Sequence, residues 1–255
     1  MTETIPAQAT GLFSERAAPA RLKDTFAAVW VHQMTSASIP PVIITPDATV
    51  DLQWFRGSLR VAGPDREAQT EHVGPNEVVI GFRFHPAAAA GWLGISMAEL
   101  TSQRCLLEDL LERRAQQMAK RVRQDGNIKS LVHSVADAIS EVSDLTKPNA
   151  TMSAAYDLVK VGAPSNTHLI PWLMSKLDMS ERTLRRSFNE SFGYGPKTLD
   201  RILRYQRFLR LLSQSNVSVA NAASEAGYSD QAHLIRECRR HTGTTPRQLQ
   251  GLLQA

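Results

Sequence analysis

The chain has 255 residues, of which 42% are hydrophobic and 21% are charged, and it carries a formal charge of +4. These values are typical of folded globular proteins and exclude a disordered or collagen-like chain. Charged residues or proline interrupt every apolar stretch before it reaches the roughly 18 residues of a membrane span, and 2 cysteines are too few for a disulfide framework. We therefore expect a cytoplasmic protein with no membrane partner.

The first part of the chain predicts a small β unit. Residues 1–20 lack the basic and apolar blocks of a secretion signal, and we expect them to form a short mobile tail. Residues 25–84 contain runs rich in Val, Ile, Phe and Trp, which Pro, Gly, Asp and Asn separate at regular places. This pattern is typical of short antiparallel strands joined by turns.

The pattern changes to helix after Pro86. Short helical stretches are expected at residues 87–94 and 96–102, and longer amphipathic helices at 106–122 and 128–142. The helix at 106–122 carries an apolar stripe, for which a place in the domain core is favoured over a dimer seam. The stripe consists of Leu107, Leu110, Leu111 and Met118.

Sequence breaks divide the chain into two domains. We predict a regulatory domain over residues 20–145, a linker over 146–164 that contains a connecting helix at 151–161, and a second domain over 165–255. From Ser165 onward, 13 basic residues oppose 7 acidic residues, whereas the rest of the chain has a small negative balance. A basic segment attached to a mildly acidic one indicates a module that binds a polyanion.

The last domain contains an internal repeat at an offset of 50 residues. The matching pairs are Leu184 and Leu234, Arg186 and Arg236, Gly193 and Gly243, Pro196 and Pro246, and Leu199 and Leu249. Each copy predicts a short helix, a tight turn at Asp178 or Gly227, and a second helix closed by glycine. We expect Ser180 and Ser229 to be the N-caps of the second helices, and the helix from Pro196 to Leu212 to link the copies. This is the helix-turn-helix pattern.

Polar residues on the second helix of each copy are the predicted DNA contacts. Arg, Gln, Asn, Thr and His are residue types that hydrogen-bond to base edges in the major groove, and helix N-termini bind phosphates. The candidate residues are Ser180, Arg182, Thr183, Arg185, Arg186 and Asn189 in the first copy, and Ser229, Gln231, His233, Arg236 and Arg239 in the second. The sequence leaves open which of them contacts a base and which a phosphate.

The segment from Met179 to Pro196, followed by that from Ala223 to Pro246, resembles the double helix-turn-helix of AraC/XylS-type transcription regulators. The resemblance covers about residues 167–249 and implies a regulator whose two recognition helices enter successive major grooves of double-stranded DNA. More faintly, upstream segments such as residues 81–86 are similar to the β-barrel-like N-terminal domain of one subgroup. The expected fold is α+β: a β-rich N-terminal domain with appended helices, and an all-α C-terminal domain of two helix-turn-helix motifs.

The second copy departs from the family pattern in its core. Ala222, Leu234 and Cys238 are small where larger apolar residues are usual, whereas Phe208 in the linker helix is large. We expect Phe208 to fill the space that the smaller residues leave. The sequence leaves open how much the second copy contributes to specific DNA affinity and whether it reads bases.

Two hypotheses remain for the N-terminal domain: a small-molecule sensor, or a module for dimerisation and partner docking. In the first, Trp30, Trp54 and Trp92 line a pocket for an effector of unknown chemistry. RNA polymerase and a second copy of the chain are further partner hypotheses.

The alternative function is a DNA-binding enzyme or metal-binding protein. It would use Cys105 or Cys238, or the histidines of the β-like runs together with Glu71 or Glu77; the histidines are His32, His72 and His85. No Walker loop, nucleophile elbow, zinc-protease motif or dinucleotide fingerprint is present. We therefore predict a protein that is not an enzyme and needs no cofactor or metal.

Overall fold

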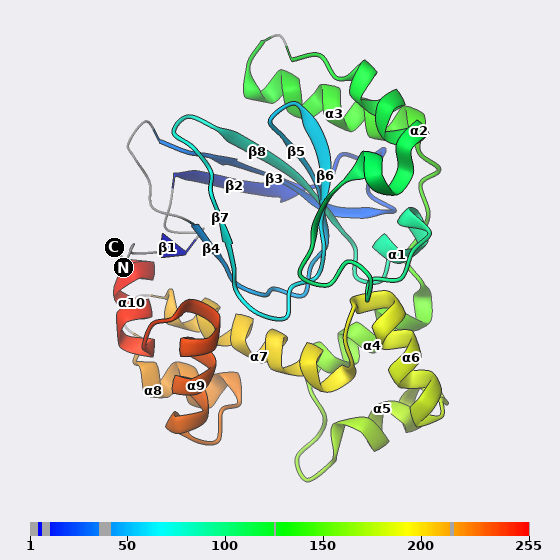
Figure 1. The fold of residues 1–255 in the computed structure, drawn as a ribbon. Helices are drawn as coiled ribbons and strands as arrows, with labels where there is room; N and C mark the ends of the chain where they lie inside the picture. The colour runs from blue at the N-terminus through cyan, green and yellow to red at the C-terminus, as the bar shows by residue number, and fades with distance from the viewer. Residues whose placement is uncertain (1–4, 7–10, 36–41, 125, 215–216, 255) are drawn as a thin grey trace.

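The computed structural model describes residues 5–6, 11–35, 42–124, 126–214 and 217–254. A strand-rich N-terminal part lies over a layer of helices formed by the C-terminal part (Figure 1). Within the described residues, none of the helices is long and apolar enough to cross a membrane. The α+β fold expected from the sequence is confirmed.

Two sheets form the N-terminal part. The larger has the strand order β2-β3-β8-β5-β6-β9 and the smaller β1-β4-β7. The strands of the larger sheet are β2 (Leu12–Ala17), β3 (Phe26–Gln33), β5 (Asp51–Phe55), β6 (Ser58–Ala62), β8 (Val78–Phe84) and β9 (Arg104–Leu106). Those of the smaller sheet are β1 (Ile5–Pro6), β4 (Val42–Ile44) and β7 (Gln69–Glu71).

The central strands of the larger sheet are largely buried, and the two faces of the sheet differ in chemistry. One face is apolar and packs against three helices, with Leu52, Trp54, Ile80 and Phe82 in the shared core. These helices are α1 (Ala89–Leu93), α2 (Leu107–Arg121) and α3 (Ile128–Val142), of which α2 and α3 lie at the top of Figure 1. The apolar stripe of α2 belongs to this core, because Leu107 and Met118 are buried in it.

Three sequence expectations for this part are wrong. Residues 12–17 do not belong to a tail: they form β2, which pairs with β3 over its whole length. As an exposed edge strand, β2 lacks the hydrophobic alternation that would reveal it. Residues 96–102 form turns, not a helix, with Ser102 at a positive φ of 57°. Leu106 lies in β9, because it pairs with Arg60 of β6.

The C-terminal part contains seven helices in the described residues. They are α4 (Ala150–Val161), α5 (Leu169–Leu177), α6 (Glu181–Phe192), α7 (Pro196–Leu212), α8 (Val219–Ala226), α9 (Gln231–Thr242) and α10 (Pro246–Gln254). The long helix α7 runs between the pair α5–α6 and the pair α8–α9 (Figure 1). The helix expected as a connector, α4, buries Met152, Ala155 and Val159 in the same core as α5, α6 and α7.

Candidate nucleic-acid interface

The first helix-turn-helix is formed by α5 and α6 and has the local geometry that the sequence predicts. Asp178 ends α5 in the left-handed region, with a φ of 50°, which turns the chain sharply toward α6. The Ser180 hydroxyl accepts a hydrogen bond from the Thr183 N–H at 3.2 Å and so caps α6. Leu184 and Phe188 are fully buried on the inner face of α6, so the opposite face is free for a partner.

The outer face of α6 carries the predicted DNA contacts. Arg182, Arg185 and Arg186 are exposed, whereas Thr183 and Asn189 are half-buried. Arg185 forms an ion pair with Glu181 at 2.6 Å, and Arg186 lies 3.8 Å from Glu190. Both pairs are solvent-exposed and therefore weak, so a phosphate or a guanine edge can replace the glutamate.

The second helix-turn-helix, α8 and α9, differs from the first at the cap. Gly227 ends α8 with a φ of 91°, but three residues separate it from α9 where two separate Asp178 from α6. The N-cap is consequently Asp230, whose carboxylate accepts from the His233 N–H at 2.6 Å. The prediction of Ser229 as N-cap is wrong, because the extra residue falls in the turn and Asp230 reaches the free N–H groups.

The predicted contacts of the second copy also lie on the outer face of its second helix. Gln231, Arg236 and Arg239 are exposed, and the half-buried His233 ring meets Tyr228 edge to face at 5.4 Å. Ser229 is exposed in the turn, one residue before the cap. The next basic residue, Arg240, is instead engaged by Glu67 of the N-terminal part.

The core of the second copy relies on aromatic residues from outside α8 and α9. Phe208 of α7 is fully buried against Ala222 and Ala226, as its size predicts. Tyr205 lies beside it with a ring-centroid distance of 6.4 Å, and Tyr228 with one of 6.0 Å. The linker helix therefore supplies the volume that the small side chains of α8 lack.

Three ionisable groups of α9, Glu237, Cys238 and His241, are buried behind its outer face. Burial disfavours the charged form of Glu237, but the His241 ring at 3.8 Å and the charge of Arg201 outweigh burial and lower the pKa of Glu237. Burial raises the pKa of Cys238 to about 12. A thiol with so high a pKa is protonated at neutral pH and is a poor nucleophile, which argues against Cys238 as a reactive cysteine.

Arg204 and Arg207 of α7 have structural partners. Arg204 binds Asp200 and lies over the Tyr228 ring at 5.9 Å, and Arg207 donates to the Lys160 carbonyl at 2.6 Å. These contacts fix α7 against α4 and against the turn between α8 and α9.

A cavity of about 490 Å³ lies between the polar face of the larger sheet, the smaller sheet and helices α4 and α7. Trp30 and His32 line it, whereas Trp54 and Trp92 are in the apolar core on the other side of the sheet. Of the three tryptophans expected in a pocket, only Trp30 lines this one.

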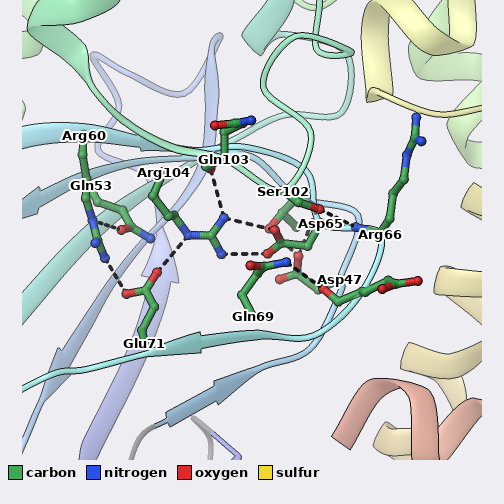
Figure 2. A network of polar contacts seen from close by, with 12 residues as sticks. Asp47, Gln53, Arg60, Asp65, Arg66, Gln69, Glu71, Ser102, Gln103 and Arg104 are labelled. Atoms are coloured by element: carbon green, nitrogen blue, oxygen red, sulfur yellow. Dashed lines mark hydrogen bonds and ion pairs between the residues drawn. The ribbon is translucent and has the colours of Figure 1, made fainter.

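A chain of buried ion pairs runs along one side of the cavity (Figure 2). Arg104 donates through Nη2 to Asp65 at 2.7 Å and through Nε to Glu71 at 2.8 Å. Arg60 joins the same Glu71 carboxylate at 2.7 Å and the Gln53 amide oxygen, also at 2.7 Å. Burial raises the pKa of Asp65 despite the nearby Arg104, whereas the two arginines hold the pKa of Glu71 below its ordinary value against burial.

The histidines do not form a metal site. The His85 Nε2–H donates a hydrogen bond to the Lys23 carbonyl at 2.8 Å, and Glu77 is bound by Arg56 at 2.7 Å. Across the described residues, no group of three or more metal-ligating side chains comes together.

The N-terminal part contacts both helix-turn-helix motifs. The first copy is held at the end of α6, where the Met97 N–H donates to the Glu190 carbonyl at 2.9 Å and Arg66 donates to the Gly193 carbonyl at 2.6 Å. The second copy is held by the ion pair of Glu67 with Arg240. Sequence analysis missed these contacts, because nothing in the residue pattern pairs positions so far apart in the chain.

Two family models match the chain. Residues 173–251 match a family described as a helix-turn-helix domain, and residues 14–106 match a domain of unknown function (DUF6597). No curated protein matches the sequence.

Solved structures with similar folds are distant in sequence. One structure of ToxT from Vibrio cholerae has 11% identity and a TM-score of 0.46, with 96% of this chain and 98% of that chain covered. ToxT of strain SCE256 with bound unsaturated fatty acid has 11% identity and a TM-score of 0.43, covering 94% and 95%. The AraC-like transcriptional activator CuxR has 15% identity and a TM-score of 0.23, covering 78% and 86%.

Proposed function

We propose that α6 and α9 recognise two successive major grooves of DNA under the control of the N-terminal domain. The premise is that residues 173–251 form an AraC-type helix-turn-helix domain and that the protein is a DNA-binding transcription regulator. The observation that carries the proposal is the pair of capped helices with exposed polar faces, held by one rigid helix. A helix of 17 residues such as α7 spans about 25 Å. With the helices at its ends, it suits major grooves about 34 Å apart.

Both recognition helices contact base edges in this proposal, and they differ in how their N-termini meet the DNA backbone. Arg182 and Arg186 contact base edges from α6, and Gln231, His233 and Arg236 do so from α9. The free backbone N–H groups at the start of α6, which Ser180 caps, attract a phosphate. Arg239 attracts a phosphate through its charge. Asp230 brings a negative charge to the start of α9, so we propose that this terminus does not hold a phosphate. The remaining candidates, Thr183, Arg185, Asn189 and Ser229, contact the backbone.

Selection of the full-length protein on random duplex DNA at physiological salt tests this proposal. Two enriched sequence elements about ten base pairs apart are expected. A single enriched element would restrict base recognition to one copy, and no enrichment of any sequence would refute specific recognition by the free protein.

Control by the N-terminal domain rests on three consecutive residues, Asp65, Arg66 and Glu67. Asp65 faces the cavity and is bound by Arg104, Arg66 holds the end of α6, and Glu67 holds Arg240 of α9. A ligand that moves Asp65 therefore changes the restraint on both helix-turn-helix motifs. Such restraint couples the cavity to DNA affinity without any direct contact between ligand and DNA.

The variant Glu67→Gln tests this coupling. We expect it to release Arg240 and to raise affinity for DNA severalfold, because the freed guanidinium gains a phosphate. The matched control is Glu99→Gln, which removes an exposed carboxylate that is not part of the Glu67–Arg240 ion pair. Equal affinities of the two variants would refute the restraint. Contacts with RNA polymerase and with a second copy of the chain stay predictions.

A further inference from the structure

The sheet wall of the cavity contains an aromatic platform. Trp30 of β3 lies over Gly81 of β8, where any Cβ would overlap the indole ring. Phe13 of β2 extends the platform, with its ring centroid 6.0 Å from that of Trp30. Because Gly81 has no side chain, the indole lies against the sheet and leaves the volume above it open to a ligand.

Three carboxylates surround one guanidinium beside this platform. Arg83 donates through Nη1 to Glu15 at 2.8 Å, through Nη2 to Asp47 at 3.3 Å and through Nε to Asp51 at 3.3 Å. All four side chains line the cavity. One positive charge therefore faces three negative charges, which leaves a local excess of two negative charges.

The polar groups of this wall are incompletely satisfied. Trp30 is only 9% exposed, and its Nε1 is directed at the Asp51 carboxyl without completing a regular hydrogen bond. Asp51 is 7% exposed, and burial together with the neighbouring Asp47 raises its pKa in spite of Arg83. Charge that is buried without full compensation is costly, so a bound cation would stabilise this wall.

We propose that the cavity binds an organic cation, with a primary amine or amidine between Glu15 and Asp51 and an apolar body against Trp30 and Phe13. The apolar side chains of Val42, Ile43 and Val79 complete the lining for the body. The volume falls in the range of small-molecule sites, which is about 300–1,000 Å³.

An anionic ligand fits Arg83 and Arg104, the two arginines of the sheet wall, poorly. Each nitrogen of the Arg83 guanidinium already binds a carboxylate, and Arg104 donates to Asp65 and Glu71 through all three of its nitrogens. A carboxylate or phosphate ligand that approaches Arg83 or Arg104 has to break these pairs and leave an acid of the wall without its partner. A cation leaves all of them intact.

Cation binding also has a consequence for regulation, which rests on the proposed function. Lys160, Arg207 and Arg210 line the opposite side of the cavity from α4 and α7. The negative wall attracts these residues, and a bound cation cancels part of that attraction. Occupancy therefore loosens the contact between the N-terminal part and α7, and so raises affinity for DNA.

Calorimetric titration of the full-length protein with three matched probes tests the ligand class. The probes are 4-phenylbutylamine, 4-phenylbutan-1-ol and 4-phenylbutanoate, which share the apolar body and differ in charge. We expect the amine to bind at least tenfold more tightly than the alcohol, and the acid to bind most weakly. Tightest binding of the acid, equal binding of amine and alcohol, or no binding of the amine would overturn the proposal.

Two variants assign the binding to the carboxylates. Asp51→Asn and the milder Glu15→Gln on the exposed edge strand are expected to lower affinity for the amine at least threefold and to leave the alcohol unchanged. Glu99→Gln should change neither. If Asp51→Asn fails to fold, Glu15→Gln decides, and unchanged amine affinity there would refute the site. Because the titration contains no DNA, it tests the ligand class alone. If the amine binds but leaves DNA affinity unchanged in a separate binding assay, only the control by the N-terminal domain is refuted.

Discussion

The two helix-turn-helix motifs reach the same backbone arrangement with different interiors. The first fills its core with large side chains of its own, such as Leu173, Leu184 and Phe188. The second has alanines on α8, and its core is filled by Tyr205 and Phe208 of the linker helix. A repeated motif therefore preserves the volume of its core and the positive-φ turn, whereas the element that supplies the volume can change.

The largest effect should come from truncating Phe208, the side chain of the linker helix that fills the core of the second copy. We expect Phe208→Ala to cost about 3–5 kcal/mol in the free energy of unfolding and to abolish the second DNA element, because no residue of α8 fills the hole. Phe188→Ala should cost as much but affect the first element. Urea unfolding and DNA selection measure the two results. A loss below about 1 kcal/mol for Phe208→Ala would show that the second copy packs without it.

The matched arginines Arg186 and Arg236 test whether both copies recognise bases. Each change to alanine should cost about 1–3 kcal/mol of binding to the selected DNA and less on random DNA. Lys176→Ala, an exposed basic residue of α5 outside the recognition helix, is the control. Fluorescence anisotropy on both DNAs measures the difference. Equal losses on selected and random DNA for Arg236→Ala alone would limit the second copy to phosphate contacts.

A smaller difference between the copies should depend on pH. The pKa of Glu237 is lowered in the folded protein, so its contribution to stability is present above its ordinary value of 4.5 and is lost as the pH falls through the lowered folded value. The first copy has no equivalent buried acid among the described residues. Below pH 4.5, we expect the stability of Glu237→Gln to fall less steeply with decreasing pH than that of the wild type. The difference in the free energy of unfolding should be about 1 kcal/mol or less. An unchanged pH profile would contradict this assignment.

The smallest effect should come from exchanging the caps. Asp230→Ser gives α9 the cap of α6, preserves the hydrogen bond to His233 and removes a negative charge near the DNA. Affinity for DNA should rise by about 0.3–1 kcal/mol, and Ser180→Asp should lower it by a similar amount. Unfolding curves serve as the control, since stability should change little. A fall in DNA affinity for Asp230→Ser would mean that the Asp230 carboxylate assists DNA binding, and would contradict this assignment.

Local sequence patterns were sufficient to predict most helices of the C-terminal domain and their buried faces. The predicted linker helix from Pro196 to Leu212 has the observed bounds, and the inward side chains of α6 are those that its spacing indicates. Caps, glycine turns and the helical period act within a few residues, so they can be recognised without knowledge of the partner. Ser229 failed as a cap because one extra residue in a turn changes which side chain reaches the helix end.

The sequence by itself determined the helix-turn-helix repeat, the linker helix, the β-rich character of the N-terminal domain and the candidate recognition residues. Only the tertiary structure decided that β2 joins the sheet, that Trp30 lies over Gly81, and that Asp65, Arg66 and Glu67 connect the cavity to both motifs. The physical reason is that strand pairing and buried ion pairs join residues distant in the chain. Each partner is an ordinary polar or small residue until the fold places it beside the other.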